Sequence, residues 1–112
     1  METDNIETQY KLFYKYWQNG HDNESIKDYQ IADNIRKKLI PAIDTIIDEE
    51  NRDFISNVYG EFADFLYFYF ICQSQQGSND SKILSEMEKM AEKAIELNAD
   101  SFAGYYYLAV FY

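Results

Sequence analysis

The sequence has little of the residues that interrupt regular structure or build reactive sites. Its 112 residues include one proline, four glycines, one cysteine and one histidine. Because turns depend on proline and glycine, their scarcity favours long elements, which we expect to be helices. The single cysteine, Cys72, excludes an intrachain disulfide and fits a reducing compartment. The single histidine, His21, cannot supply the paired Glu-x-x-His motifs of a di-iron helical bundle.

Basic residues are also scarce. Ten lysines and arginines stand against 20 aspartates and glutamates, which gives a formal net charge of −10. A surface of this sign repels phosphate groups, so we expect no binding to nucleic acid. The same charge favours basic partners among proteins and peptides.

Long apolar runs are missing from the sequence as well. The longest, FLYFYFIC from Phe65 to Cys72, is far shorter than the roughly 20 residues that a membrane-spanning helix needs. The N-terminus, METDNIETQY, is polar and acidic, unlike a signal peptide. We therefore expect a cytoplasmic protein with no membrane interaction.

Apolar residues recur at helical spacing in five segments, and the first two fill the N-terminal part of the chain. The first helix is predicted from about Thr3 to Gln18, with Asn19-Gly20 ending it. Asp22 or Asn23 would cap the second helix. Pro41 either breaks this second helix or kinks it, and we favour a kinked continuation.

The third predicted helix follows an acidic turn at residues 48–51 and includes FLYFYFIC. Its phenylalanines, tyrosines and isoleucine also favour a strand, but the sequence has no second strand to pair with it. A polar loop is predicted over residues 73–81, followed by a fourth helix from Ser81 to Leu97. Asp100 or Ser101 would cap the last helix, which is predicted over residues 102–112.

These helices are expected to share a core of large apolar side chains with one small residue. The residues predicted to form this core are Phe13, Trp17, Ile35, Phe62, Leu66, Tyr69, Ala94 and Leu108.

The C-terminal stretch KAIELNADSFAGYYYLAVFY carries the most specific pattern in the sequence. Tyr105, Leu108, Ala109 and Tyr112 follow the spacing of a Trp-x-x-Leu-Gly-x-x-Tyr motif, with tyrosine in place of tryptophan and alanine in place of glycine. This pattern resembles the tetratricopeptide repeat family, whose helix-turn-helix units are about 34 residues long.

The helical segments and their short connections predict an all-α fold of four to five antiparallel helices, and the resemblance implies that these form repeat-like helix hairpins. We expect one helical domain over 1–112, with a divergent portion over 1–75 and a repeat-like helix pair over 79–112. Whether the chain is the first part of an α-solenoid stays open. The family's turn proline is replaced by Ala99. The small residue Ala109 would allow two helices to approach closely, so we expect that a larger side chain there disrupts the last helix pair.

Three functions are compatible with these features. The resemblance implies a non-catalytic protein-interaction scaffold or adaptor, because helical repeats form surfaces that hold peptides or partner helices. Tyr106 and Val110 are its candidate partner-binding residues. The second function is a structural or regulatory subunit that self-associates through residues 102–112.

The third function, and the least favoured, is a small-ligand binder or enzyme with an aromatic pocket under FADFLYFYFIC. Glu61 and Asp64 lie about one helical turn apart, and carboxylates at that spacing can bind a divalent cation. However, the sequence contains no phosphate-binding glycine loop, nucleophile elbow or Cys/His zinc spacing. We therefore expect no catalytic residues, no cofactor and no metal.

Overall fold

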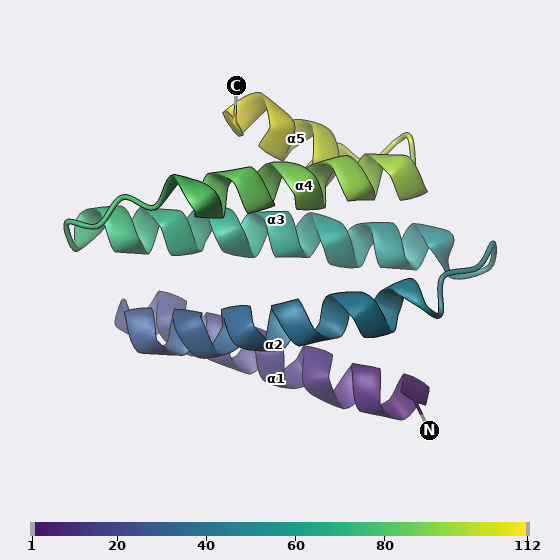
Figure 1. The fold of residues 1–112 in the computed structure, drawn as a ribbon, viewed down its shortest axis with the longest axis horizontal. Coiled ribbons are helices and arrows are strands. Elements are labelled where there is room, and N and C mark those ends of the chain that lie inside the picture. Colours follow the sequence, from purple (N-terminus) through teal and green to yellow (C-terminus); the bar gives the residue numbers. More distant parts are fainter. Residues whose placement is uncertain (1, 112) are drawn as a thin grey trace. The chain divides into compact units, whose positions relative to one another are not determined.

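The computed structural model describes residues 2–111, with side chains from residue 5 to residue 110. Over this range the chain forms helices and connecting turns without a strand, so the all-α prediction is confirmed (Figure 1). The helix over FLYFYFIC also excludes the strand alternative for that segment. The helices are α1 (Glu2–Asn23), α2 (Ile26–Asp44), α3 (Arg52–Gln75), α4 (Ser81–Leu97) and α5 (Phe102–Phe111).

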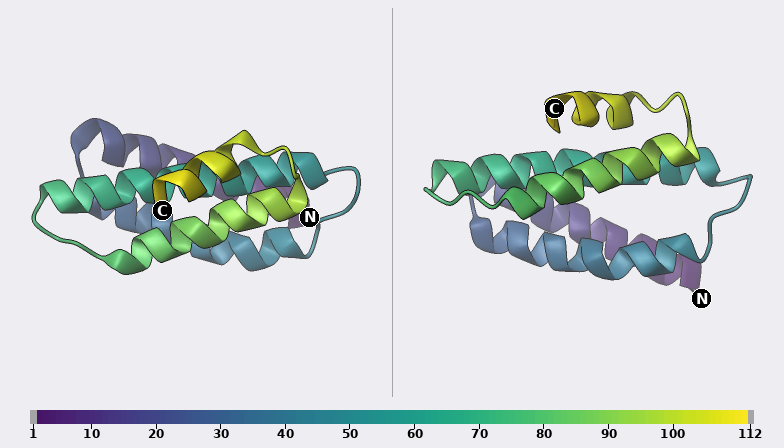
Figure 2. Two further views of the ribbon diagram at one scale, coloured as in Figure 1. Left: turned by 90° about the horizontal axis from the view of Figure 1, so that it is seen from above. Right: turned by 45° about the horizontal axis from the view of Figure 1, so that its top comes forward.

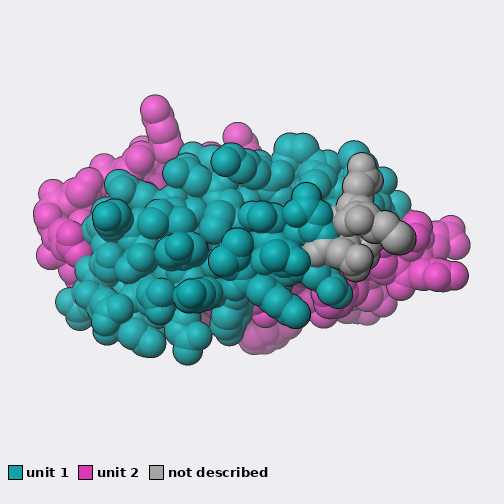
Figure 3. Space-filling model, turned by 90° about the horizontal axis from the view of Figure 1, so that it is seen from below, with its two compact units in different colours: residues 1–47 teal, residues 48–112 magenta. Residues whose placement is uncertain are grey.

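The chain divides into two compact units, which Figure 3 shows in different colours. Unit 1 comprises residues 1–47 and contains α1 and α2, whereas unit 2 comprises residues 48–112 and contains α3, α4 and α5. The sequence boundary between 75 and 79, where the repeat resemblance begins, lies inside unit 2. Helix α3 therefore belongs with the two helices that follow it.

In unit 1, α1 is longer than the sequence predicted. It continues through Gly20 to Asn23, so the prediction that Asn19-Gly20 ends the helix is wrong. The turn is made by Glu24, which has a φ of 51°, and the amide of Ser25 donates to the Gly20 carbonyl at 3.0 Å. This is the hydrogen bond of a Schellman motif. Gly20 serves packing instead, because a Cβ there would lie 2.9 Å from Cδ2 of Tyr29.

Helix α2 begins at a cap that the sequence analysis missed. The hydroxyl of Ser25 accepts a hydrogen bond from the Asp28 amide at 3.2 Å, so neither Asp22 nor Asn23 is the cap. The helix then runs through Pro41 to Asp44, which confirms a continuation rather than a break. It also buries Arg36, whose Nε donates to Asp33 at 2.9 Å.

In unit 2, α3 and α4 form a hairpin closed by a second Schellman motif. Helix α3 extends to Gln75, so the connecting loop is shorter than the predicted 73–81. Gly77 has a φ of 86°, and the amide of Ser78 donates to the Gln73 carbonyl at 2.9 Å. Asp80 then caps α4, accepting from the Lys82 amide at 3.0 Å.

Side chains from the start of α3 satisfy the carbonyl groups at the end of α4. The hydroxyl of Ser56 donates to the Ala94 carbonyl at 2.7 Å, and Nε of Arg52 donates to the Leu97 carbonyl at 3.0 Å. Buried or half-buried carbonyls at a helix end need such partners. These bonds fix the point from which the chain turns into α5.

The predicted core is correct for five of its eight members. Three predicted members, Trp17, Ile35 and Leu108, are only partly buried. The members that are buried are Phe13, Phe62, Leu66, Tyr69 and Ala94.

Candidate functional site

Helix α5 packs across both α3 and α4 within unit 2 (Figure 2). Its N-cap is Ser101, whose hydroxyl accepts from the Gly104 amide at 3.0 Å, which resolves the choice between Asp100 and Ser101. Ser101 is itself buried, so the cap satisfies an amide that water does not reach. The predicted last helix is thus confirmed from residue 102 to 111, while Tyr112 lies outside the described residues.

Two glycines bring α5 close to its neighbours. A Cβ on Gly104 would lie 2.6 Å from Cγ1 of Ile95 and 2.9 Å from the Ala91 carbonyl oxygen. On α3, a Cβ on Gly60 would lie 2.8 Å from the Cβ of Ala103. The expectation that Ala109 makes the close approach is wrong, because Ala109 is exposed. The rotation of α5 turns Gly104 inward and leaves Ala109 on the opposite side.

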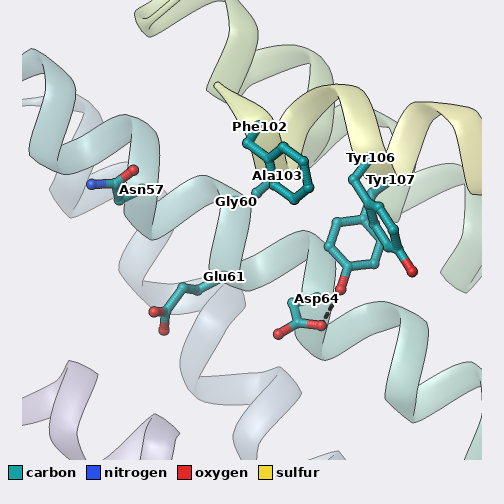
Figure 4. A pocket seen from close by; sticks show the side chains of 8 residues that line it. All are labelled: Asn57, Gly60, Glu61, Asp64, Phe102, Ala103, Tyr106 and Tyr107. Atoms are coloured by element: carbon teal, nitrogen blue, oxygen red, sulfur yellow. Dashed lines mark hydrogen bonds between the residues drawn. The ribbon is translucent and has the colours of Figure 1, made fainter. Parts of the chain in front are cut away.

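A tyrosine-carboxylate hydrogen bond joins α5 to α3. The hydroxyl of Tyr107 donates to Oδ1 of Asp64 (Figure 4). Tyr107 is 9% exposed, and its burial raises the pKa of the hydroxyl above the ordinary value, with a further contribution from the bond to Asp64. Its ring also lies 5.8 Å from that of Tyr67 and 4.9 Å from that of Tyr106. The hydroxyl of Tyr107 therefore stays protonated and donates its hydrogen to the carboxylate of Asp64.

The other side of α5 carries large apolar and aromatic side chains that are exposed. Phe102 is 82% exposed, and the rings of Phe102 and Tyr106 are stacked with centroids 6.1 Å apart. The two predicted partner-binding residues, Tyr106 and Val110, both lie on this side. We name it the outer face of α5, and it consists of Phe102, Tyr105, Tyr106 and Val110.

A groove of about 510 Å³ runs between α5 and the adjacent side of α3 (Figure 4). The groove includes the Tyr107–Asp64 hydrogen bond, and two of its lining residues, Phe102 and Tyr106, belong to the outer face. Carboxylates and aromatic rings line it, and no lysine, arginine or histidine of the described chain does. Val110 is not one of its lining residues. The groove is lined by Asn57, Gly60, Glu61, Asp64, Phe102, Ala103, Tyr106 and Tyr107.

The structure brings Glu61 and Asp64 to this groove but does not assemble a metal site from them. Among the described residues, no group of three or more histidine, cysteine, aspartate or glutamate side chains could hold a metal ion.

A second cavity, of about 300 Å³ and lined mainly by aliphatic and amide side chains with Lys38, lies within unit 1. None of the described helices is long and apolar enough to cross a membrane.

The groove was not predicted because its two walls are far apart in sequence. Asp64 and Tyr107 are 43 residues apart, and no local spacing links them. The chain matches no protein-family model, no curated protein and no solved structure. The tetratricopeptide resemblance therefore remains an expectation drawn from the residues around Tyr105.

Proposed function

We propose that this chain is a non-catalytic protein-interaction module of the tetratricopeptide-like type. Unit 2 would bind a protein or peptide partner on the outer face of α5 and in the adjoining groove. The observation that carries the proposal is the exposure of Phe102, Tyr105, Tyr106 and Val110 on one helix. Contiguous apolar patches of this kind are typical of interaction sites.

The way α5 is held supports this proposal. Gly104 and Tyr107 fix its inner side against the hairpin, so the outer face is presented on a rigid support. A rigid surface loses less conformational entropy on binding than a mobile one. Its tyrosines add contact area at low entropic cost, since a tyrosine side chain has only two rotatable χ angles.

The packing of α5 is also compatible with a repeat-like arrangement. Helix α5 contacts both α3 and α4, as the first helix of a following unit contacts the preceding hairpin in a stacked array. The acidic composition favours a basic partner. The single cysteine, Cys72, is buried and forms no disulfide, which fits the cytoplasmic location that we propose.

The proposal is tested by selecting binders from a random 12-residue peptide library displayed on phage, with the full chain as target. Selection is followed by calorimetric titration of the synthetic peptides against the wild type and a Phe102→Ser/Tyr106→Ser variant. We expect peptides that bind the wild type and lose at least about tenfold in affinity for the variant, since buried aromatic anchors dominate such interfaces. No selected peptide, or equal affinity for both proteins, would overturn the proposal.

A matched control comes from exposed aromatic residues outside the groove. Phe54 is 68% exposed and Tyr14 is 48% exposed, and neither lines the groove. The double variant Phe54→Ser/Tyr14→Ser removes the same two residue types, and we expect it to bind the selected peptides like the wild type.

Self-association is the competing use of the outer face. Light scattering after size exclusion, at several protein concentrations, distinguishes self-association from binding of a different partner. We expect a monomer, because two copies of a chain with a net charge of −10 repel each other. A dimer that the Phe102→Ser/Tyr106→Ser variant abolishes would instead mean that a second copy covers this face.

A further inference from the structure

We infer that the groove between α3 and α5 binds an arginine side chain of the partner segment, with the guanidinium group against the rings of Phe102 and Tyr106 and its N–H groups directed to Asp64. This inference rests on the proposed function and specifies the chemistry of the partner. Three properties of the groove support it.

The first property is the sign of its charge. Glu61 and Asp64 line the groove, and between residues 5 and 110 no cationic side chain lines it. Both carboxylates are only partly exposed, so their field is less screened by water and salt than that of fully exposed acids. A cationic ligand is therefore favoured over a neutral or anionic one.

The second property is the orientation of Asp64. Tyr107 donates to Oδ1, and within the described chain no other hydrogen bond or ion pair reaches the carboxylate. Figure 4 shows the carboxylate pointing to Tyr107 from α3, with its second oxygen directed away from that bond. Oδ2 is thus an acceptor held in place by its neighbour. Holding an acceptor in place lowers the entropic cost of a charge-assisted hydrogen bond.

The third property is the aromatic wall beside these carboxylates. Phe102 and Tyr106 are one helical turn apart, and their ring planes meet at 26° in a stacked arrangement. Such rings attract a cation placed over their faces. Arginine suits the combination better than lysine, because its planar guanidinium can stack on a ring and donate in its own plane at the same time.

The test uses the peptides selected against the full chain. We expect arginine to be enriched in them relative to the unselected library. The best arginine peptide is then resynthesised with citrulline, which keeps the shape of the side chain and removes its charge. We expect a loss of about tenfold or more in affinity for the wild type, as for other charge-assisted hydrogen bonds.

Variants of the protein show whether the arginine acts at this groove. Asp64→Asn keeps an oxygen that can accept from Tyr107. We expect this variant to lower the affinity for the arginine peptide about tenfold and the affinity for the citrulline peptide little. Asp100→Asn removes the same charge from an exposed position outside the groove and should leave both affinities within about twofold.

The outcomes separate the inference from the proposed function. Selected peptides without arginine enrichment, or with equal affinity after citrulline substitution, would overturn the arginine site and leave the interaction module standing. Equal weakening by Asp64→Asn and Asp100→Asn would mean attraction by overall charge, and would also overturn the site. A selection that yields no peptide overturns both. The citrulline comparison on the wild type decides the question even if Asp64→Asn does not fold.

Discussion

The two units close their hairpins in the same way and use their inward-facing glycines differently. In unit 1 the Schellman turn is made by Glu24, and in unit 2 by Gly77. Gly20 in unit 1 makes room for the ring of Tyr29 within a two-helix hairpin. Gly104 in unit 2 makes room for a third helix, placed against the backbone of α4 at Ala91.

This difference explains why unit 2 carries the exposed outer face of α5 that we propose as the partner surface. Gly20 lets the ring of Tyr29 pack inside the hairpin of α1 and α2. Gly104 lets α5 pack closely on α4, and α5 adds a further helix with one exposed side. In unit 2 the outer face of α5 is the result.

The largest expected effect comes from Gly104→Ala. The added Cβ would lie 2.6 Å from a side-chain carbon of Ile95 and 2.9 Å from the carbonyl oxygen of Ala91, and this backbone oxygen cannot move without shifting α4. We expect unit 2 to lose about 1–3 kcal/mol of unfolding free energy, as in other overpacked cores. Urea denaturation measures the loss, and hydrogen exchange should show faster exchange in α5.

Gly20→Ala sharpens the same comparison. Its three nearest atoms all belong to the side chain of Tyr29, whereas Gly104 also faces a backbone oxygen. The gain in helix propensity of about 0.5–1 kcal/mol offsets part of the clash, so we expect a smaller net loss than for Gly104→Ala. A loss as large in unit 1 as in unit 2 would contradict the distinction between ring and backbone contacts.

Tyr107→Phe tests the polar attachment of α5. It removes the hydrogen bond to Asp64, and we expect a loss of about 1–2 kcal/mol near neutral pH, since the acceptor is charged. Thermal unfolding of the variant and the wild type measures this loss. Tyr106→Phe is the matched control, because within the described residues the Tyr106 hydroxyl makes no hydrogen bond that the variant would remove.

The pH dependence of this pair has a definite sign. The pKa of Tyr107 is higher in the folded chain than in an unfolded one, where it is about 10. Its stabilising contribution is therefore complete below pH about 10 and is lost as the pH rises above that value. The stability difference between the wild type and Tyr107→Phe should shrink above pH about 10. A difference that stays constant to higher pH would contradict the role of the protonated hydroxyl.

Glu24→Gly tests the similarity of the two turns. Glu24 adopts a left-handed conformation with a φ of 51°, which glycine adopts without steric cost. We expect unit 1 to gain about 0.5–1 kcal/mol, measured by urea denaturation, because glycine is favoured at this position after a helix. In unit 2, Gly77→Ala should cost a similar amount, since Gly77 has a φ of 86°. No change in either variant would mean that the turns do not limit stability.

The smallest effect is expected for Ala109→Leu. Ala109 is exposed on the side of α5 opposite to Gly104, so a larger side chain there extends away from the packing against α3 and α4. We expect an unfolding free energy within about 0.5 kcal/mol of the wild type, which thermal denaturation would measure. A loss comparable to that of Gly104→Ala would show that α5 is rotated from the orientation described.

The sequence was sufficient to predict the helices and insufficient to predict their rotation. The bounds of α4 were predicted correctly, since its apolar spacing is regular and a polar loop precedes it. Gly20 was misread as a helix end because glycine serves equally as a terminator and as a point of close contact. Which small residue of α5 faces inward, Gly104 or Ala109, depends on packing against α3 and α4. Local spacing does not contain that information.

The candidate site was predictable only in part for the same reason. Tyr106 and Val110 were selected as residues off the core stripe, and both are exposed. The groove itself depends on the contact between Asp64 and Tyr107, which come from different helices. No periodic pattern in the sequence reports that contact.

The most direct test of the account is an NMR titration of the ¹⁵N-labelled full chain with the tightest peptide from the selection. We predict that the perturbed amides gather at residues 57–64 of α3 and 102–110 of α5, around the groove and the outer face. Perturbations confined to residues 1–47, or spread evenly over the acidic surface, would contradict the claim that α5 forms the partner site.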